Sequence, residues 1–459
     1  MESLDAWIER QYRHSASALM HSVSPRIVKT RPGFAQTVRP HQGSIVASPV
    51  LGAYDPEPDY FFHWFRDSAV VIEAVRVLFE ETDSAGLLGS GGLPGKAQPL
   101  GKGELLGHFA DFVRFSLSLQ HLDGRRLAET PWREAVAADF RQFLRSAEDL
   151  SAAHGESLLG ETRVNADGTL DISKWPRPQN DGPALRAISL LHWQASAALD
   201  VELAANVEAL LRADLRYTQS HWREACFDIW EEEKGLHYYT LRAAATALEG
   251  GAEWLERSQE SAEAALYRSD AAAILAALDA YWREDLQFFK SRVLEAQSPS
   301  SKELDIAVIF AAIHAGAHAP THSVRDPRMH ATLARLEALF EAQYAINRNR
   351  PAGRGPAMGR YAGDVYYSGG AYYFSTLAAA EFCFRAAAHS SSKSTLMARG
   401  DAFLETVRAY TPPSGDLSEQ FDPNTGAQRS AQQLAWSYAA FITCIQARRR
   451  LGGGREARA

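Results

Sequence analysis

The sequence predicts an all-α fold. Apolar residues recur at three- and four-residue spacing along most of the chain, as on one face of a helix, whereas the strict alternation typical of a strand is scarce. Long segments rich in Gly, Pro, Asn and Asp separate the helical stretches and recur after roughly every second helix. Alternate connections in a ring of helix pairs emerge on one face, so this order fits an (α/α) toroid. A multi-helix bundle fits it as well.

The predicted helices follow the chain from end to end. The first lies near the N-terminus, where Leu4, Trp7, Ile8, Tyr12 and Leu19 share one face. Further helices are expected at 70–78, 105–119, 183–196, 199–217, 238–256, 261–281, 303–315, 327–345, 371–388, 396–409 and 434–445. The segment 303–315 is apolar on all sides, as an inner helix of a two-layered ring would be. An additional helix-like segment runs from Trp132 to His154.

Composition excludes several classes of protein. The chain has 459 residues, of which 46% are hydrophobic and 23% charged, as in an ordinary globular protein. Its formal net charge is -8 and no long Lys/Arg run interrupts it, so we expect no nucleic-acid partner. The most apolar stretch, Ile306 to Ala319, is too short to span a bilayer, so we expect no membrane partner either. The sequence does not give an oligomeric state.

Cysteine usage bears on the compartment. Cys226, Cys383 and Cys444 are an odd number, widely spaced and without CxxC or nearby histidine spacing, which argues against a disulfide framework and against a zinc site. We interpret them as buried thiols in a reducing compartment. The N-terminal segment has helical periodicity and no continuous apolar core of the kind found in a signal peptide. We therefore expect a cytoplasmic protein.

Long loops carry the residue types that suggest a site. Loops of this length in a compact domain are usually functional or disordered, and disordered segments tend to lack aromatic residues. The five loops run from Gly43 to Pro58, Gly86 to Gly103, Gly155 to Pro183, Asn347 to Gly370 and Pro412 to Thr425. Only Gly86 to Gly103 resembles a plain flexible insertion. No stretch resembles a domain linker.

The segment "PDYFFHWFRDSAV" combines Tyr60, Trp64, Arg66 and Asp67. An aromatic face can cover the apolar face of a sugar ring while a charged pair binds two hydroxyl groups through charge-assisted hydrogen bonds. The alternative is structural, with Asp67 as a plain N-cap and the aromatic residues in the core. Both interpretations stay open on these residues alone.

The segment "KWPRPQNDGPALRA" holds Trp175 and Arg177 between prolines. Asn180 or Asp181 suits an N-cap and Pro183 the first helical turn. Rigid presentation of an indole and a guanidinium suggests ligand recognition, although Arg177 would equally serve to hold the loop by salt bridges.

Three consecutive glutamates occur in "CFDIWEEEKG", where Glu231, Glu232 and Glu233 follow Trp230. Adjacent residues of a helix or strand point in different directions, so at most one or two of these side chains can face one spot. The alternative is a solvated helix start, where acidic groups sit favourably against the helix dipole.

Further candidates lie on the last two loops. "GRYAGDVYYSGGAYYF" holds Arg360 among a cluster of tyrosines, and "SEQFDPNTGAQRSAQQLAW" holds Glu419 before a turn. Ser430 and Gln433 have the spacing of a capping box for the last helix. Two carboxylates on separate loops of one face are what glycoside hydrolysis requires, one as acid and one as base or nucleophile. No competing nucleophile triad, phosphate loop or HExxH motif is present.

Taken in order, these blocks resemble those of the glucoamylases, glycoside hydrolase family 15. The resemblance rests on "PDYFFHWFRDS", "WPRPQNDGPALRA", "DIWEE", "GRYAGD" with "YYSGG", and "SEQFDPNTG" with "LAWSYAAF". It implies an (α/α)6 barrel and a single catalytic domain over residues 1–459, with a core from about residue 4 to 449. It also implies an inverting exo-hydrolysis that releases β-D-glucose from non-reducing ends, without cofactor or metal.

The resemblance assigns a role to each matching residue. Glu231 would be the general acid and Glu419 the general base that activates water. The substrate-binding residues that it implies are Tyr60, Trp64, Arg66, Asp67, Trp175, Arg177, Asp228, Glu232 and Arg360. Tyr372 stands where a subsite tryptophan is common in the family, and Glu233 would be solvated.

The resemblance leaves the substrate open. A hydrolase of α-1,4-linked short gluco-oligosaccharides leads, and an α-1,6 glucohydrolase, a trehalase of the same family and a non-catalytic sugar sensor are the alternatives. Retention of both Glu231 and Glu419 argues against the sensor.

Overall fold

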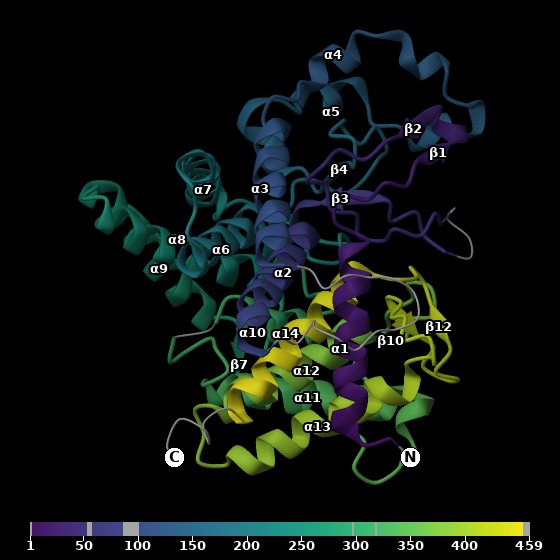
Figure 1. Cartoon of the computed structure of the whole chain (residues 1–459), viewed down its shortest axis with the longest axis vertical. Helices are drawn as coiled ribbons and strands as arrows, with labels where there is room; N and C mark the ends of the chain where they lie inside the picture. Colours follow the sequence, from purple (N-terminus) through teal and green to yellow (C-terminus); the bar gives the residue numbers. More distant parts are fainter. Residues whose placement is uncertain (1, 53–56, 86–100, 296–297, 317–318, 453–459) are drawn as a thin grey trace.

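Helices dominate the computed structural model of the chain (Figure 1). The structure describes residues 2–52, 57–85, 101–295, 298–316 and 319–452. Its long helices are α1 (Leu4–Met20), α2 (Phe65–Ala85), α3 (Lys102–Leu119), α6 (Asp181–Ser196), α7 (Val201–His221), α8 (Tyr238–Arg257), α9 (Ser261–Asp279), α10 (Ala307–His314), α11 (Pro327–Gln343), α12 (Tyr373–Ala387), α13 (Lys393–Tyr410) and α14 (Ala435–Gly452). Each of them overlaps a helix that the periodicity predicts.

The helices form a closed ring of pairs. An inner helix contacts the next inner helix in the order α2, α6, α8, α10, α12, α14, and α14 returns to α2. Each inner helix also packs on an outer partner, namely α3, α7, α9, α11, α13 and α1 respectively. Figure 1 shows the first and last of these helices, α1 and α14, next to each other. The (α/α)6 toroid is therefore confirmed, and the helix-bundle alternative is excluded.

Burial follows the two layers. Every residue from Ala307 to Ile313 of α10 is buried, which is why this inner helix is apolar on all sides. The outer helix α11 buries one stripe instead, and that stripe includes Met329, Leu333, Leu336 and Phe340 at helical spacing. The periodicity of each segment therefore reports its layer.

Short strands pair next to the ring and hold the connections that carry the site. They are β1 (Lys29–Arg31), β2 (Gln36–Val38), β3 (Phe62–Trp64), β4 (Arg163–Asn165), β5 (Cys226–Phe227), β6 (Lys234–His237), β7 (Trp282–Arg283), β8 (Phe288–Phe289), β9 (Arg292–Leu294), β10 (Ala371–Tyr372), β11 (Gln420–Phe421) and β12 (Gln428–Arg429). All pairs are antiparallel, in the orders β1-β2, β3-β4, β5-β6-β9, β7-β8 and β10-β11-β12. Two of these sheets flank the segments that contain Glu231 and Glu419.

The expected helix from Trp132 to His154 does not form as one helix. The segment contains two 3-10 turns, Pro131–Glu134 and Ala138–Phe143, and the short helix α5 (Ala147–Ala152). Its apolar residues turn toward Phe34, whose ring lies 5.2 Å from that of Phe140, instead of packing on the ring of helices. This segment, with the short helix α4 (Gly124–Ala128), forms one end of the molecule beside β1 and β2 (Figure 1).

Two other expectations concern the connections and membranes. The flexible insertion expected from Gly86 to Gly103 lies, apart from its last three residues, outside the described part of the chain. Among the described helices, none is long and apolar enough to cross a membrane.

Candidate active site

A cavity of about 230 Å3 opens at the end of the ring where inner helices begin. Arg66 and Asp67 come from the first turn of α2, Phe374 from that of α12 and Trp436 from that of α14. The full lining is Ala47, Tyr60, Trp64, Arg66, Asp67, Trp175, Pro176, Ile229, Trp230, Glu231, Glu232, Arg360, Tyr366, Phe374, Glu419, Leu434 and Trp436. Glu231 and Glu419, which are far apart in sequence, thus line one cavity.

Glu231 lies in the turn between β5 and β6. Phe227 pairs with Lys234 across this hairpin, so residues 228–233 must reverse the chain. Glu231 has φ +65°, a left-handed conformation that costs a residue with a Cβ about 1–2 kcal/mol. Its backbone N–H donates to the carbonyl oxygen of Asp228 at 2.9 Å. The surrounding structure therefore holds this residue in a strained position that aims its side chain into the cavity.

Three donors surround the carboxylate of Glu231, whose side chain is 10% exposed. Trp64 Nε1 donates to Oε1 at 2.8 Å, and Arg66 Nη2 donates to the same oxygen at 3.2 Å. Trp175 Nε1 donates to Oε2. Both oxygens are thereby oriented by side chains from β3, from the first turn of α2 and from the loop that contains Trp175. Trp64 and Trp175 thus contact the predicted acid in addition to lining the cavity.

Glu419 immediately precedes β11 and is 8% exposed. Burial raises the pKa of its carboxyl group to about 7, while a hydrogen bond from the Ser430 hydroxyl opposes the rise. The Tyr60 hydroxyl lies 3.4 Å from Glu419 Oε1 and forms a 2.6 Å hydrogen bond with the Tyr366 hydroxyl. The interpretation of Ser430 as a helix cap is wrong, because α14 begins only at Ala435 and the Ser430 hydroxyl donates to Glu419.

A buried charge cluster lies beside the two glutamates. Arg66 Nη2 is 3.0 Å from Asp67 Oδ2, and Arg66 Nη1 is 3.8 Å from Asp181 Oδ2. Burial raises the pKa of Asp67, and it raises that of Asp181 to about 6. Across the described residues, Arg66 Nε and Nη1, Asp67 Oδ2 and both carboxylate oxygens of Asp181 have no hydrogen-bond partner. Unsatisfied buried groups are costly, so a polar ligand with hydroxyl groups would be well matched here.

Glu232 belongs to a second charged group, which it forms with Arg360, Tyr361 and Lys302. Arg360 is bidentate to Asp364, at 2.7 and 2.5 Å, and donates to Glu232 Oε1 at 3.2 Å. Tyr361 and Lys302 both donate to Glu232 Oε2, at 2.5 and 2.7 Å. The Glu232 and Arg360 side chains thus reach the cavity wall already oriented.

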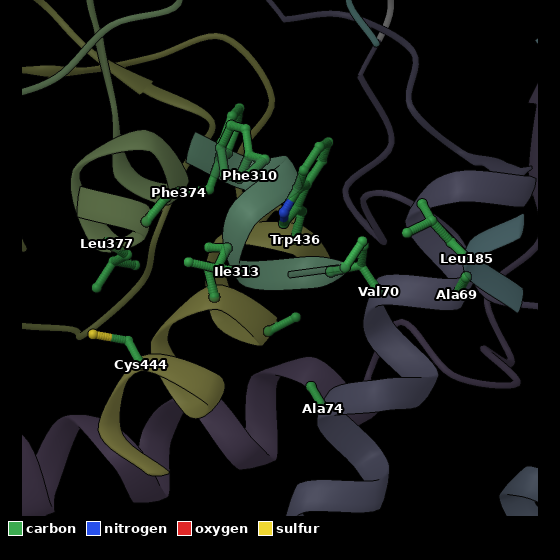
Figure 2. Packing of buried hydrophobic residues seen from close by; sticks show 14 of the residues in the cluster. Ala69, Val70, Ala74, Leu185, Phe310, Ile313, Phe374, Leu377, Trp436 and Cys444 are labelled. Carbon is green, nitrogen blue, oxygen red and sulfur yellow. The ribbon is translucent and has the colours of Figure 1, made fainter. Parts of the chain in front are cut away.

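Aromatic rings form the base of the cavity. The rings of Phe374 and Trp436 stack with centroids 4.8 Å apart and an interplanar angle of 12°. Phe310 lies 5.4 Å from Trp436. Figure 2 shows these three side chains together, with Ile313 and Val70 beyond them in the core. The base is thus apolar, whereas charged and hydroxyl groups line the walls.

Most of the predicted site residues line this cavity, but three do not. Arg177 instead forms ion pairs with Glu161 at 2.7 Å and with Asp171 at 3.3 Å, the salt-bridge alternative that the sequence left open. Asp228 is buried and accepts backbone N–H groups of its own turn. Tyr372 is fully buried, and its hydroxyl donates to Asp364 at 3.0 Å. These three residues therefore lie outside the lining of this cavity, and their role in substrate binding stays a prediction.

Glu233 also differs from the expectation. Its carboxylate accepts from Arg292 Nη1 at 2.8 Å and from the Ser300 hydroxyl at 2.9 Å, so it is an ion-paired residue and not a free, solvated one. The expectation fails because Arg292 is far away in sequence and reaches the turn only through the pairing of β6 with β9.

Sequence reasoning missed several lining residues. Trp436 lies in the block "LAWSYAAF" and Tyr366 in the tyrosine cluster. The sequence thus marks both segments as part of the site, but it does not indicate which residue of each segment lines the cavity. Asp181 is not part of the lining, but it lies 3.8 Å from Arg66, and its place in the sequence indicates only a possible cap. Phe374 gave no signal of its own, because an apolar residue at a helix start usually packs in the core.

A model of the family described as "Glycosyl hydrolases family 15" matches residues 147–399 and 390–446 of the chain. The chain belongs to glycoside hydrolase family 15. It is similar to "Probable glucoamylase" of Schizosaccharomyces pombe, with 27% identity over 492 residues that cover 98% of this chain and 93% of that protein. It is similar to "Glucoamylase 1" of Rhizopus oryzae as well, with 26% identity over 97% of this chain and 71% of that one.

A solved family 15 structure agrees with the fold. The glucoamylase from Hypocrea jecorina superposes with a TM-score of 0.76 and 25% sequence identity, covering 98% of this chain and 73% of that one. The chain is therefore a glycoside hydrolase with the (α/α)6 architecture of its family.

Proposed function

We propose that the chain is an inverting, exo-acting α-glucosidic hydrolase of glucoamylase type, which releases β-D-glucose from the non-reducing ends of short α-linked gluco-oligosaccharides. One observation carries the proposal. Glu231 and Glu419 come from separate loops, yet both line the same cavity, whose base is aromatic. Family membership adds the acid/base chemistry that such a pair performs.

In the proposed reaction, Glu231 gives its proton to the glycosidic oxygen as the bond from that oxygen to C1 breaks. Glu419 takes a proton from a water molecule that attacks C1 from the opposite face. The new C1–O bond then has the opposite configuration, so an α-glucoside yields β-glucose. Glu419 acts in its ionised form, and burial, which raises its pKa to about 7, makes this carboxylate a stronger base for the water proton.

The remaining cavity residues would position the sugar. Arg66 and Asp67 form an ion pair and also have polar atoms without a hydrogen-bond partner, which suit two hydroxyl groups of the glucose unit being cleaved. Phe374 and Trp436 offer an apolar surface to the ring. Tyr60, held by Tyr366, places an electron-rich ring near the centre that becomes positively charged in the transition state.

The proposal includes a cytoplasmic location. It is supported by Cys226, Cys383 and Cys444, which are all buried free thiols. Free thiols persist in a reducing compartment. Cell fractionation of the native host would contradict this part if the protein appeared outside the cytoplasm.

The experiment follows hydrolysis of maltotriose, isomaltose and trehalose in parallel by proton NMR, recording the rate and the anomer of the glucose first formed. β-Glucose from maltotriose, formed faster than from the other two sugars, is expected. Faster release from isomaltose or trehalose would transfer the assignment to the α-1,6 or trehalase alternative. α-Glucose would overturn the inverting mechanism, and no glucose from any of them would favour a non-catalytic sugar sensor.

A further inference from the structure

We propose that Arg292 is a positioning residue for the general acid: it fixes the turn that holds Glu231 in its strained, cavity-facing conformation. This inference rests on the proposed function, because it takes Glu231 as the proton donor. Arg292 lies on β9, outside the cavity lining, and no motif in the sequence points to it.

Arg292 is 2% exposed and contacts three carboxylates. Its Nη1 donates to Asp228 Oδ2 at 2.6 Å and to Glu233 Oε2 at 2.8 Å, and its Nη2 donates to Asp305. Asp228 and Glu233 are the first and last residues of the turn between β5 and β6. One guanidinium group therefore ties together both ends of the acid-bearing turn.

The link continues from Arg292 to the backbone on both sides of Glu231. The other oxygen of Asp228, Oδ1, accepts the N–H of Trp230 at 3.1 Å and that of Glu232 at 2.9 Å. These two residues flank Glu231, whose own N–H bonds to the Asp228 carbonyl. The orientation of a single carboxylate thus sets the left-handed conformation at Glu231, and Arg292 sets the orientation of that carboxylate.

A second branch anchors the turn to the ring of helices. Asp305 Oδ2 accepts from Trp230 Nε1 at 2.8 Å and from Arg292, while its Oδ1 accepts the N–H of Ala307 at the start of α10. Trp230 is itself part of the cavity wall. The acid is thereby fixed relative to an inner helix, which supplies the rigid frame against which Glu419 and the sugar are also placed.

This arrangement predicts a specific kinetic defect. Arg292→Lys keeps a positive charge, but an ammonium group has no planar fork with which to bind three carboxylates. The turn would relax and Glu231 would move away from the leaving oxygen, and misplacement by about 1 Å can cost on the order of 100-fold in rate. Sugar binding by Arg66, Asp67 and the aromatic base would be unaffected.

The test compares two substrates that differ in their need for a general acid. Maltotriose needs a proton on its leaving oxygen, whereas the fluoride of α-D-glucosyl fluoride leaves without strong acid assistance. For Arg292→Lys we expect kcat on maltotriose to fall about 10- to 100-fold. KM should be unchanged, and kcat on the fluoride should fall less than about threefold. Glu231→Gln is the reference, with a larger loss on maltotriose and a similarly small one on the fluoride.

Arg186→Lys is the matched control. Arg186 is also fully buried and bidentate to one carboxylate, that of Asp214 at 2.9 and 2.7 Å, but it contacts neither the turn nor the cavity lining. This variant should lower the free energy of unfolding while keeping the ratio of the two rates. Glu233→Gln removes the negative charge from one of the three contacts of Arg292, at a partly exposed site, and should shift the ratio in the same direction by less.

The outcomes separate the two levels of the proposal. If Glu231→Gln loses activity on both substrates equally, the acid assignment fails, and the proposed function fails with it. A second outcome is that Glu231→Gln loses activity on maltotriose but keeps it on the fluoride. If Arg292→Lys or Glu233→Gln then loses both activities to the same extent, or loses neither of them, Arg292 is not a positioning residue. Should Arg292→Lys not fold, the ratio measured for Glu233→Gln decides alone.

Discussion

Replacing Ser430 by alanine tests whether the buried carboxyl group of Glu419 must be ionised for catalysis. The Ser430 hydroxyl donates to Glu419 Oε2 and stabilises the carboxylate form, opposing the burial that raises the pKa of this group to about 7. Without this donor, the pKa rises further. Since a general base is inactive when protonated, the acidic limb of the pH profile should move to higher pH.

The size of the shift follows from the kind of hydrogen bond that is lost. A hydrogen bond to a charged group contributes about 1.5–3 kcal/mol, and one pKa unit corresponds to about 1.4 kcal/mol. We therefore expect the acidic limb of log(kcat/KM) to move upward by about one to two pH units. The rate on the alkaline side of this limb should change little, because the ionised carboxylate of the variant is still a competent base.

The assay measures kcat/KM for maltotriose from pH 4 to 9, since this parameter reports the ionisation of the free enzyme. Ser430 has φ +61°, so Ser430→Gly, which relieves that strain, should give the same shift as Ser430→Ala. Ser418→Ala is the control, because the Ser418 hydroxyl donates to the carbonyl oxygen of Gln420 and not to Glu419. An acidic limb that stays in place in both Ser430 variants would refute this account of Glu419.

Three further predictions concern stability and orientation. Glu419→Gln should raise the free energy of unfolding by up to about 3 kcal/mol at pH 8 and by little at pH 4.5. The folded-state pKa of about 7 exceeds the ordinary glutamate value of 4.5, so the protonated form stabilises the fold at low pH and this contribution is lost as the pH rises through 7. Equal gains at both pH values in urea denaturation would contradict this. Arg177→Met should lower the free energy of unfolding by about 3 kcal/mol, because the buried negative charge of Glu161 loses one of its cationic partners. KM for maltotriose should be unchanged in the enzyme that remains folded. A raised KM without a loss of stability would indicate that Arg177 binds the substrate. Trp175→Phe removes a donor to Glu231 and should lower kcat on maltotriose about tenfold while sparing α-D-glucosyl fluoride, and equal losses on the two substrates would argue for a binding role instead.

Local patterns predict the helices and the difference between inner and outer ones, but they leave a toroid and a multi-helix bundle open, and the (α/α)6 ring follows from the family resemblance. A helix that is buried on all sides, such as α10, differs in its own sequence from one with a single apolar stripe, such as α11. The order of loops after alternate helices then placed the candidate residues on one face.

The sequence could not supply contacts between distant segments. Arg292 reaches Glu233 through a strand pairing, and Asp181 is 3.8 Å from Arg66 although 115 positions separate them in sequence. Ser430 matched a capping pattern by spacing alone, yet its left-handed backbone turns the hydroxyl toward Glu419. In each case a long-range contact, absent from the local pattern, decides what the side chain does.

Glu231 as acid and Glu419 as base have different roles, and a comparison of Glu419→Gln with Glu231→Gln distinguishes them. The measurement is kcat on maltotriose and on α-D-glucosyl fluoride for both variants. Glu419→Gln should lose both activities, since attacking water needs the base with either substrate, whereas Glu231→Gln should lose only the activity on maltotriose. The reverse pattern, with Glu419→Gln retaining activity on the fluoride and Glu231→Gln losing it, would contradict the account.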